Sequence, residues 1–263
     1  PQYFQPEIQP FINEKWFPKY NQKLQYNKWV EDLKKEIPSD FYEKRKIGEN
    51  DDEICKFIQK DLIEEFIIYV NKNCYFVNST INLSIYETNN FILKMGEKIF
   101  SKGISLIKYT AFFGSIQIFN YLRKNGAKLK SSLWLYAVHG QNPEIINFLE
   151  ENKIFPLKND KISFGEVYKE SIKCHHIDVA NYIQNNYLQN ENGYPNYTLN
   201  NCLKYYNFIF IQCDIDNDTS FCYLCKYDYY LLVFIILEKT DIDINTKIVC
   251  TVIFFYKIQN YIF

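Results

Sequence analysis

The sequence predicts an all-α protein built from repeated pairs of short helices. The stretch YTAFFGSIQIFNYLRKNGA (109–127) contains no Pro, and its apolar residues recur every three or four positions, as on one face of a helix. Gly114 divides it into two apolar runs, and Gly126 follows the second run. The same arrangement recurs farther along the chain. Together these observations predict helix-turn-helix hairpins that stack into a solenoid.

Composition limits the classes of function. The chain has 263 residues, 47% of them hydrophobic, which suffices for one large domain or a repeat array. Its net charge of -1 gives no basic surface for nucleic acid or for an anionic membrane. The longest apolar runs, 231–236 and 248–255, are shorter than the roughly 18 residues of a membrane span. We therefore expect neither nucleic acid nor membrane as a partner.

The eight cysteines point to a compartment. A chain of this length does not need disulfides, and its first residues, PQYFQPEIQP, do not resemble a signal peptide. We expect reduced thiols and a location in the cytoplasm, or in the nucleus.

Residues 1–50 are expected to form an N-terminal cap, partly helical and partly irregular. Five of the eight prolines lie here. One helix is predicted within KYNQKLQYNKWVEDLKKE (19–36), and Pro38 ends it.

From residue 51 the pattern becomes helical. DDEICKFIQKDLIEEFIIYVNK (51–72) predicts two helices, one with Ile54, Phe57 and Ile58 on its apolar face and one with Phe66 and Val70. Residues 82–103 are expected to be an irregular connection with a short helix.

The glycines explain the next hairpin. Gly114 is expected to end the first helix, because glycine adopts the left-handed conformation at little cost. Ser115 is the expected N-cap of the second helix, and Gly126 is its C-cap. Thr110 and Ala111 are small and allow the two helices to approach closely.

This pattern repeats at 131–152, 166–186 and 221–245. Gly140, His175 and Asp228 stand where the first unit has Gly114. The spacings are 140−114 = 26, 175−140 = 35 and 228−175 = 53, so an insertion is expected at about 187–220.

These units resemble the ankyrin repeat, in the divergent form that is abundant in some protist parasites. The resemblance is carried by SLIKYTAFFGSIQIFNYLRKNGAK (105–128), by SSLWLYAVHGQNPEIINFLEEN (131–152) and by HHIDVANYI (175–183), where His176 matches the family's His and Asp178 its acidic position. TDIDIN (240–245) is similar to the end of a repeat, and 61–73 to the second helix of an earlier one. No unit keeps an intact T-P-L-H, and the spacings depart from the family period of about 33.

The resemblance implies four to five degenerate repeats over 51–245, with short or missing β-hairpin fingers, and a truncated or diverged tail at 246–263. Stacking of the first two hairpins is expected to bury ten residues: Ile107, Ala111, Ile118, Phe119, Leu122, Leu133, Ala137, Ile145, Ile146 and Leu149.

The resemblance also implies a function. Ankyrin repeats bind proteins, and the two variable positions before each glycine project onto the concave groove. We therefore expect a monomeric scaffold that binds an unidentified protein partner without catalysis or cofactor. The corresponding positions are Phe112, Phe113, Val138, His139, Lys173, Cys174, Lys226 and Tyr227. Alternatively, Phe112 and Phe113 pack under a neighbouring loop.

Other interpretations remain open. The chain is alternatively a fragment of a longer array whose activity lies elsewhere. Cys222 and Cys225, with Cys213 and 174–176, suggest zinc, but buried cysteines explain them more simply, so no metal is expected.

Catalysis has weaker support. A nucleophilic pair of Cys174 or Cys213 with His139, or an enzyme in the insertion using Cys202 and Cys213, has no supporting motif, so no catalytic residue is expected. The repeat pattern explains His176 as a hydrogen-bonding link between units and His175 as a replacement for glycine.

Overall fold

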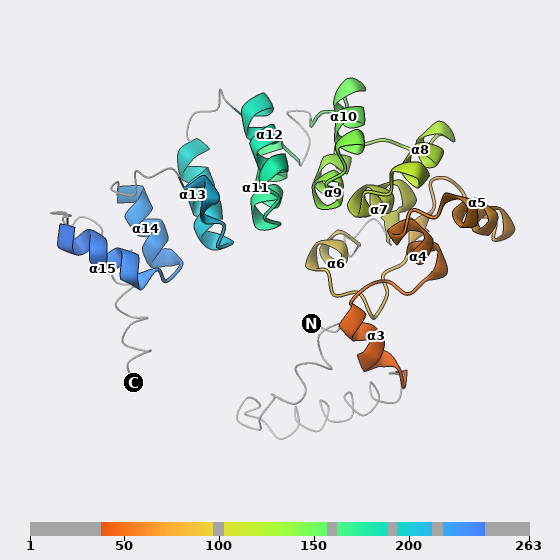
Figure 1. Cartoon of the computed structure of the whole chain (residues 1–263), viewed down its shortest axis with the longest axis horizontal. Helices are drawn as coiled ribbons and strands as arrows, with labels where there is room; N and C mark the ends of the chain where they lie inside the picture. Colours follow the sequence, from red (N-terminus) through yellow and green to blue (C-terminus); the bar gives the residue numbers. More distant parts are fainter. Residues whose placement is uncertain (1–37, 97–102, 157–161, 189–193, 212–217, 240–263) are drawn as a thin grey trace, which may run out of the picture. The chain divides into compact units, whose positions relative to one another are not determined.

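The computed structural model describes residues 38–96, 103–156, 162–188, 194–211 and 218–239. These residues form thirteen α-helices, one 3-10 helix and one pair of two-residue strands, which confirms the all-α prediction (Figure 1). The chain divides into two compact units. The first comprises residues 1–109 and 124–127, and the second comprises residues 110–123 and 128–263.

The first unit contains the helix pair predicted for residues 51–72. Its elements are α3 (Phe41–Ile47), α4 (Glu53–Gln59), α5 (Ile63–Lys72), β1 (Thr80–Ile81), α6 (Asn90–Gly96) and β2 (Ile104–Ser105). α4 and α5 contact each other and bury Ile54, Ile58, Phe66 and Val70, as their apolar spacing predicts. The sequence did not predict α3, and the helix expected within 19–36 lies outside the described residues.

A buried arginine ties α3 to the connection that follows α5. Nη1 of Arg45 donates to the carbonyl oxygens of Ile85 at 2.8 Å and Glu87 at 2.7 Å. Gly48 ends α3 in the left-handed conformation, and its carbonyl accepts from the backbone N–H of Thr88 at 2.9 Å. A charged side chain is tolerated in this position because its hydrogen bonds replace those to water.

The second unit consists of helices joined in series. α7 (Leu106–Phe113) begins in the first unit and ends in the second. It is followed by α8 (Ile116–Lys124), α9 (Leu133–Gly140), α10 (Pro143–Glu151), α11 (Phe164–Lys173), α12 (Ile177–Tyr187), α13 (Tyr194–Lys204), the 3-10 helix η4 (Phe208–Phe210), α14 (Asp218–Lys226) and α15 (Tyr230–Lys239).

One turn recurs at the ends of several helices. Gly114, His175, Tyr206 and Asp228 all have positive φ, between 57° and 68°. At Gly114 the next N–H, that of Ser115, bonds back to the carbonyl of Thr110 at 3.0 Å, and the N–H of Gly114 bonds to Ala111. The same two bonds recur at the other three turns. This is the Schellman motif. The same two bonds also follow α4, at Asp61, and α10, at Lys153.

The second hairpin departs from the expected alignment. Gly140 was predicted to hold the turn position of the second hairpin, as Gly114 does in the first. It is instead the last residue of α9, and Gln141 takes the left-handed conformation with φ 48°. Gly140 is required for another reason. A Cβ there would lie 2.2 Å from the carbonyl oxygen of Ala111 and 2.6 Å from the nitrogen of Gly114. The glycine therefore permits backbone contact between the ends of α7 and α9.

Side chains complete this contact between the first two hairpins. Asn142 caps α10 through its Oδ1, and its Nδ2 donates to the carbonyl of Gly114 at 2.9 Å. The rings of Phe119 in α8 and Phe148 in α10 lie 5.6 Å apart, and Arg123 lies over Phe148. All ten residues predicted to be buried have at most 7% of their surface exposed.

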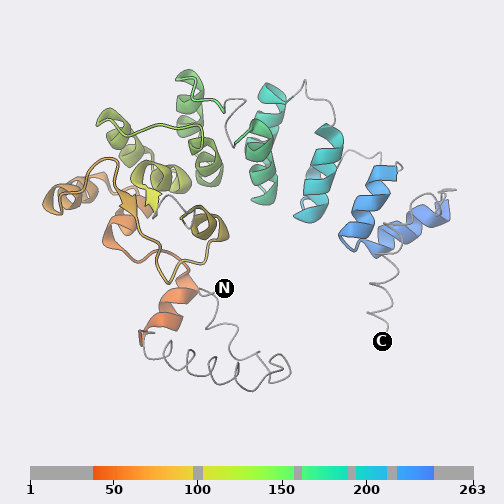
Figure 2. The same ribbon diagram turned by 180° about the vertical axis from the view of Figure 1, so that it is seen from behind.

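The later helices continue the series. α11 contacts α9, α12 and α13, and α14 contacts α13 and α15 (Figure 2). α13 and η4 fall in the stretch that the sequence treats as an insertion. Because α13 contacts both α11 and α14, this described part of the expected insertion belongs to the helical series. The expected motif at 240–245 lies outside the described residues.

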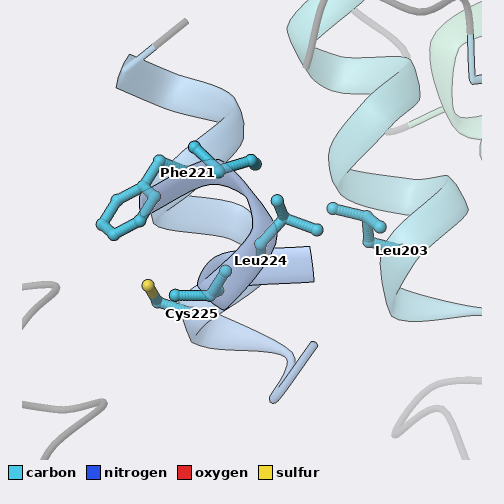
Figure 3. Packing of buried hydrophobic residues seen from close by; sticks show 6 residues of the cluster. Leu203, Phe221, Leu224 and Cys225 are labelled. Atoms are coloured by element: carbon cyan, nitrogen blue, oxygen red, sulfur yellow. The ribbon is translucent and has the colours of Figure 1, made fainter. Parts of the chain in front are cut away.

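A compact apolar cluster joins α13, α14 and α15. Its buried members are Leu203, Phe221, Leu224, Cys225, Val233 and Ile236, of which Figure 3 labels four. The other face of α15 exposes Leu231, at 63%, and Phe234, at 50%. None of the described helices has the length and apolar character needed to cross a bilayer.

Neighbouring substitutions test the contact of α7 with α9. Gly140→Ala should lower the free energy of unfolding by about 1–3 kcal/mol, because the added Cβ overpacks against backbone that has little freedom to move. Gln141→Gly should leave the stability unchanged or raise it by up to about 1 kcal/mol, since it relieves a left-handed conformation. Urea unfolding followed by circular dichroism measures both. Equal losses in the two variants would contradict this account of Gly140.

The apolar cluster gives a second test. Leu224→Ala should cost about 2–5 kcal/mol, the usual penalty for a cavity in a packed core. Leu231→Ala makes the same chemical change on the exposed face of α15 and should change stability by no more than about 0.5 kcal/mol. Thermal unfolding of the two variants compares them, and a small effect at Leu224 would show that α14 is not packed as described.

Candidate functional site

The two aromatic residues at the end of α7 pack against side chains of the second unit. Phe112 is 9% exposed, and its ring stacks on His139 of α9, with centroids 4.7 Å apart. Phe113 is half-buried and meets Phe112 edge-on at 5.0 Å. Phe112 therefore packs against the neighbouring hairpin, and Phe113 retains the larger exposed area.

Val138 does not lie on the surface where the sequence placed it. Its side chain is 1% exposed, so it is unavailable to a partner. The residue instead contributes its carbonyl oxygen, which accepts a hydrogen bond from Nδ1 of His176 at 2.7 Å. Val138 belongs to α9 and His176 precedes α12. This confirms that His176 links neighbouring hairpins.

The two adjacent histidines have separate tasks. Burial lowers the pKa of His176, which favours the neutral ring that donates from Nδ1. His175 is exposed and takes the left-handed conformation at φ 59°, as expected for a replacement of glycine. Its Nε2 lies 3.0 Å from the carbonyl oxygen of Tyr205.

The remaining predicted positions lie at the ends of α11 and α14. Nζ of Lys173 lies 2.7 Å from Oε1 of Glu170. Lys226 is exposed, with its ammonium 5.2 Å from the centre of the Tyr227 ring. Tyr227 is half-buried and donates its hydroxyl to Oδ1 of Asn200 at 2.8 Å.

The structure assembles a polar cluster of His139, Glu170 and Cys174. Nε2 of His139 lies 3.2 Å from Oε1 of Glu170. Sγ of Cys174 lies 3.6 Å from Nδ1 and 3.8 Å from Nε2 of His139, and 3.9 Å from Oε1 of Glu170. His139 and Cys174 are a pair that the sequence offered only as an unsupported nucleophile. Glu170 was missed, and its position four residues before Cys174 on a helix was the one available signal.

The electrostatics of this cluster oppose nucleophilic catalysis. Burial pushes the pKa of Glu170 upward, but hydrogen bonds from His139 and Lys173 outweigh it and hold the pKa below its usual value. Burial and the Glu170 charge raise the pKa of Cys174 to about 12. A nucleophilic cysteine needs its thiolate, so the thiol at this position is poorly suited to attack.

Of the cysteines in the expected insertion and the C-x-x-C motif, Cys202 and Cys225 are buried. Cys202 is fully buried in α13, and burial raises its pKa to about 11. Cys225 is buried, as the simpler interpretation predicts, and Cys222 is half-buried. Cys213 lies outside the described residues.

Comparisons of the chain with models of known families, with curated proteins and with solved structures find no match. The resemblance to the ankyrin repeat therefore rests on the motifs of the sequence alone.

Substitutions of the two histidines test their different roles, His176 as a link between hairpins and His175 as the left-handed residue of a turn. His176→Ala should lower the free energy of unfolding by about 1–3 kcal/mol, because it leaves the Val138 carbonyl without this donor. His175→Gly loses one exposed hydrogen bond but relieves a left-handed residue, so its net effect should stay within about 1 kcal/mol. Chemical denaturation at neutral pH measures the two. A larger loss at His175 would contradict these assignments.

Proposed function

We propose that the chain is a protein–protein interaction module of ankyrin-like helical hairpins, without catalytic activity. The partner binds to side chains at the ends of the first helix of each hairpin in the second unit. We call this the helix-end surface and define it by Phe113, His139, Lys173, Lys226 and Tyr227. The observation that carries the proposal is that each of these residues lies one or two positions before a left-handed residue that ends a helix.

The turn supports the proposal because it repeats a backbone geometry. Phe113 directly precedes Gly114, and Tyr227 directly precedes Asp228. Lys173 lies two residues before His175, and His139 two before Gln141. Successive residues of a helix point about 100° apart. Phe113 and Tyr227, each one residue before its turn, therefore share one direction, and Lys173 and Lys226, each two residues before, share another. A series of such helices offers a partner several side chains on a common, rigid support.

The chemistry of these residues suits protein recognition. Phe113 and Tyr227 are half-buried rings that need little further ordering, and tyrosine is enriched among the residues that dominate interface energy. Lys226 adds an exposed positive charge beside an aromatic ring. Aromatic anchors bordered by charged residues are typical of interfaces between proteins.

The protonation of two buried thiols supports the proposed absence of catalysis. The pKa values of Cys174 and Cys202 are raised by burial, the opposite of what an activated nucleophile requires.

Affinity capture from a native cell extract tests the helix-end surface. Lys226→Glu and Phe113→Ala should each weaken capture of one specific protein by about tenfold or more, as expected for residues that contribute at least about 1.4 kcal/mol to an interface. Neither change removes a fully buried side chain, so the helical circular-dichroism signal should persist.

Lys153→Glu is the matched control, because Lys153 is exposed in the loop after α10, outside the helix-end surface. It reverses the same charge and should leave capture unchanged. Equal capture by all variants would remove the assignment of this surface.

A further inference from the structure

We propose that His139, Glu170 and Cys174 form a binding site for one Zn²⁺ ion. The proposal does not require the proposed function, although His139 and Lys173 also belong to the helix-end surface, and it revises the expectation of no metal. Among the described residues, these three form the one group of potential ligands whose donor atoms all lie within 4.8 Å of one another. Two helices supply them, since His139 belongs to α9 and the other two to α11 and its C-cap.

The distances suit an ion of this size. Nε2 of His139, Oε1 of Glu170 and Sγ of Cys174 form a triangle with sides of 3.2, 3.8 and 3.9 Å. A circle through its corners has a radius of about 2.1 Å, and zinc binds nitrogen, oxygen and sulfur ligands at about 2.0–2.3 Å. Small rotations of the side chains would direct their lone pairs toward this point.

The ligand types select the metal. Imidazole nitrogen, carboxylate oxygen and thiolate are the three protein ligands of zinc, whereas calcium and magnesium prefer oxygen alone. Three protein ligands leave a fourth tetrahedral position for water. The side chains of His139 and Glu170 are 11% and 15% exposed, so the site is shielded but not sealed from solvent.

Lys173 is the group that a cation must displace. Its Nζ lies 2.7 Å from Oε1 of Glu170, the proposed ligand atom. The Lys173 side chain is 35% exposed and can turn toward solvent when the ion arrives. The Lys173 ammonium group therefore supplies the positive charge beside Glu170 that a bound Zn²⁺ ion would supply in its place.

Titration of the full chain with Co²⁺, a spectroscopic substitute for zinc, tests the site. One equivalent should bind and give the absorption of a cobalt–thiolate bond, and Zn²⁺ should displace it. Cys174→Ser should abolish this absorption. Cys74→Ser is the matched control, because Cys74 is an exposed cysteine in the other unit, and it should leave the absorption unchanged.

Two further variants keep the test decisive if Cys174→Ser fails to fold. Glu170→Gln should weaken binding by about tenfold or more, since even outer partners of a metal contribute that much. Lys173→Met removes the competing ammonium group without touching a ligand and should bind more tightly than the natural chain. Absence of the thiolate absorption, its persistence in Cys174→Ser, or weaker binding by Lys173→Met would each overturn the proposal.

Discussion

The structure of the second unit depends on one recurrent turn, a left-handed residue that ends a helix. At Gly114, His175, Tyr206 and Asp228 two backbone hydrogen bonds close the helix and reverse the chain within a few residues. A non-glycine residue in this conformation costs about 1–2 kcal/mol. The paired backbone bonds and the burial of the following helix offset that cost. The turn therefore persists although its side chain differs each time.

Close approach between hairpins follows from the turns. Gly140 allows the backbone of α9 to meet that of α7, and Asn142 bonds across the same contact. Farther along, His176 donates to the carbonyl of Val138, and Glu170 meets His139. These polar contacts lie at the same end of the hairpins as the turns. Neighbouring helix ends are therefore held by hydrogen bonds, while apolar side chains fill the space between the helices.

The helix-end surface and the proposed zinc site share this region for the same reason. The side chains just before each turn project beside those of the next hairpin, so His139 reaches Glu170 and Cys174, residues 31 and 35 positions away. Phe112, which belongs to the preceding hairpin, stacks on His139. A side chain just before a turn can contact either the adjacent hairpin or a partner molecule. Its burial shows which of the two is available to it. Val138 and Phe112 face the hairpin, whereas Lys226 remains exposed.

Sequence reasoning alone predicts the helices at 51–72 and 104–152, the left-handed turns at Gly114, His175 and Asp228, and the ten buried residues of the first two hairpins. These features follow from local periodicity and backbone preference, which a short stretch of chain already contains. Sequence reasoning wrongly placed Val138 on the surface. It could not predict that Gly140 serves close packing and Gln141 the turn, because the two roles differ only in what lies opposite. Nor could it predict α3 or the incorporation of α13 into the helical series. The cluster of Glu170 with His139 and Cys174 was equally invisible, since its members meet only when α11 packs beside α9, and that distance depends on every side chain between the two helices.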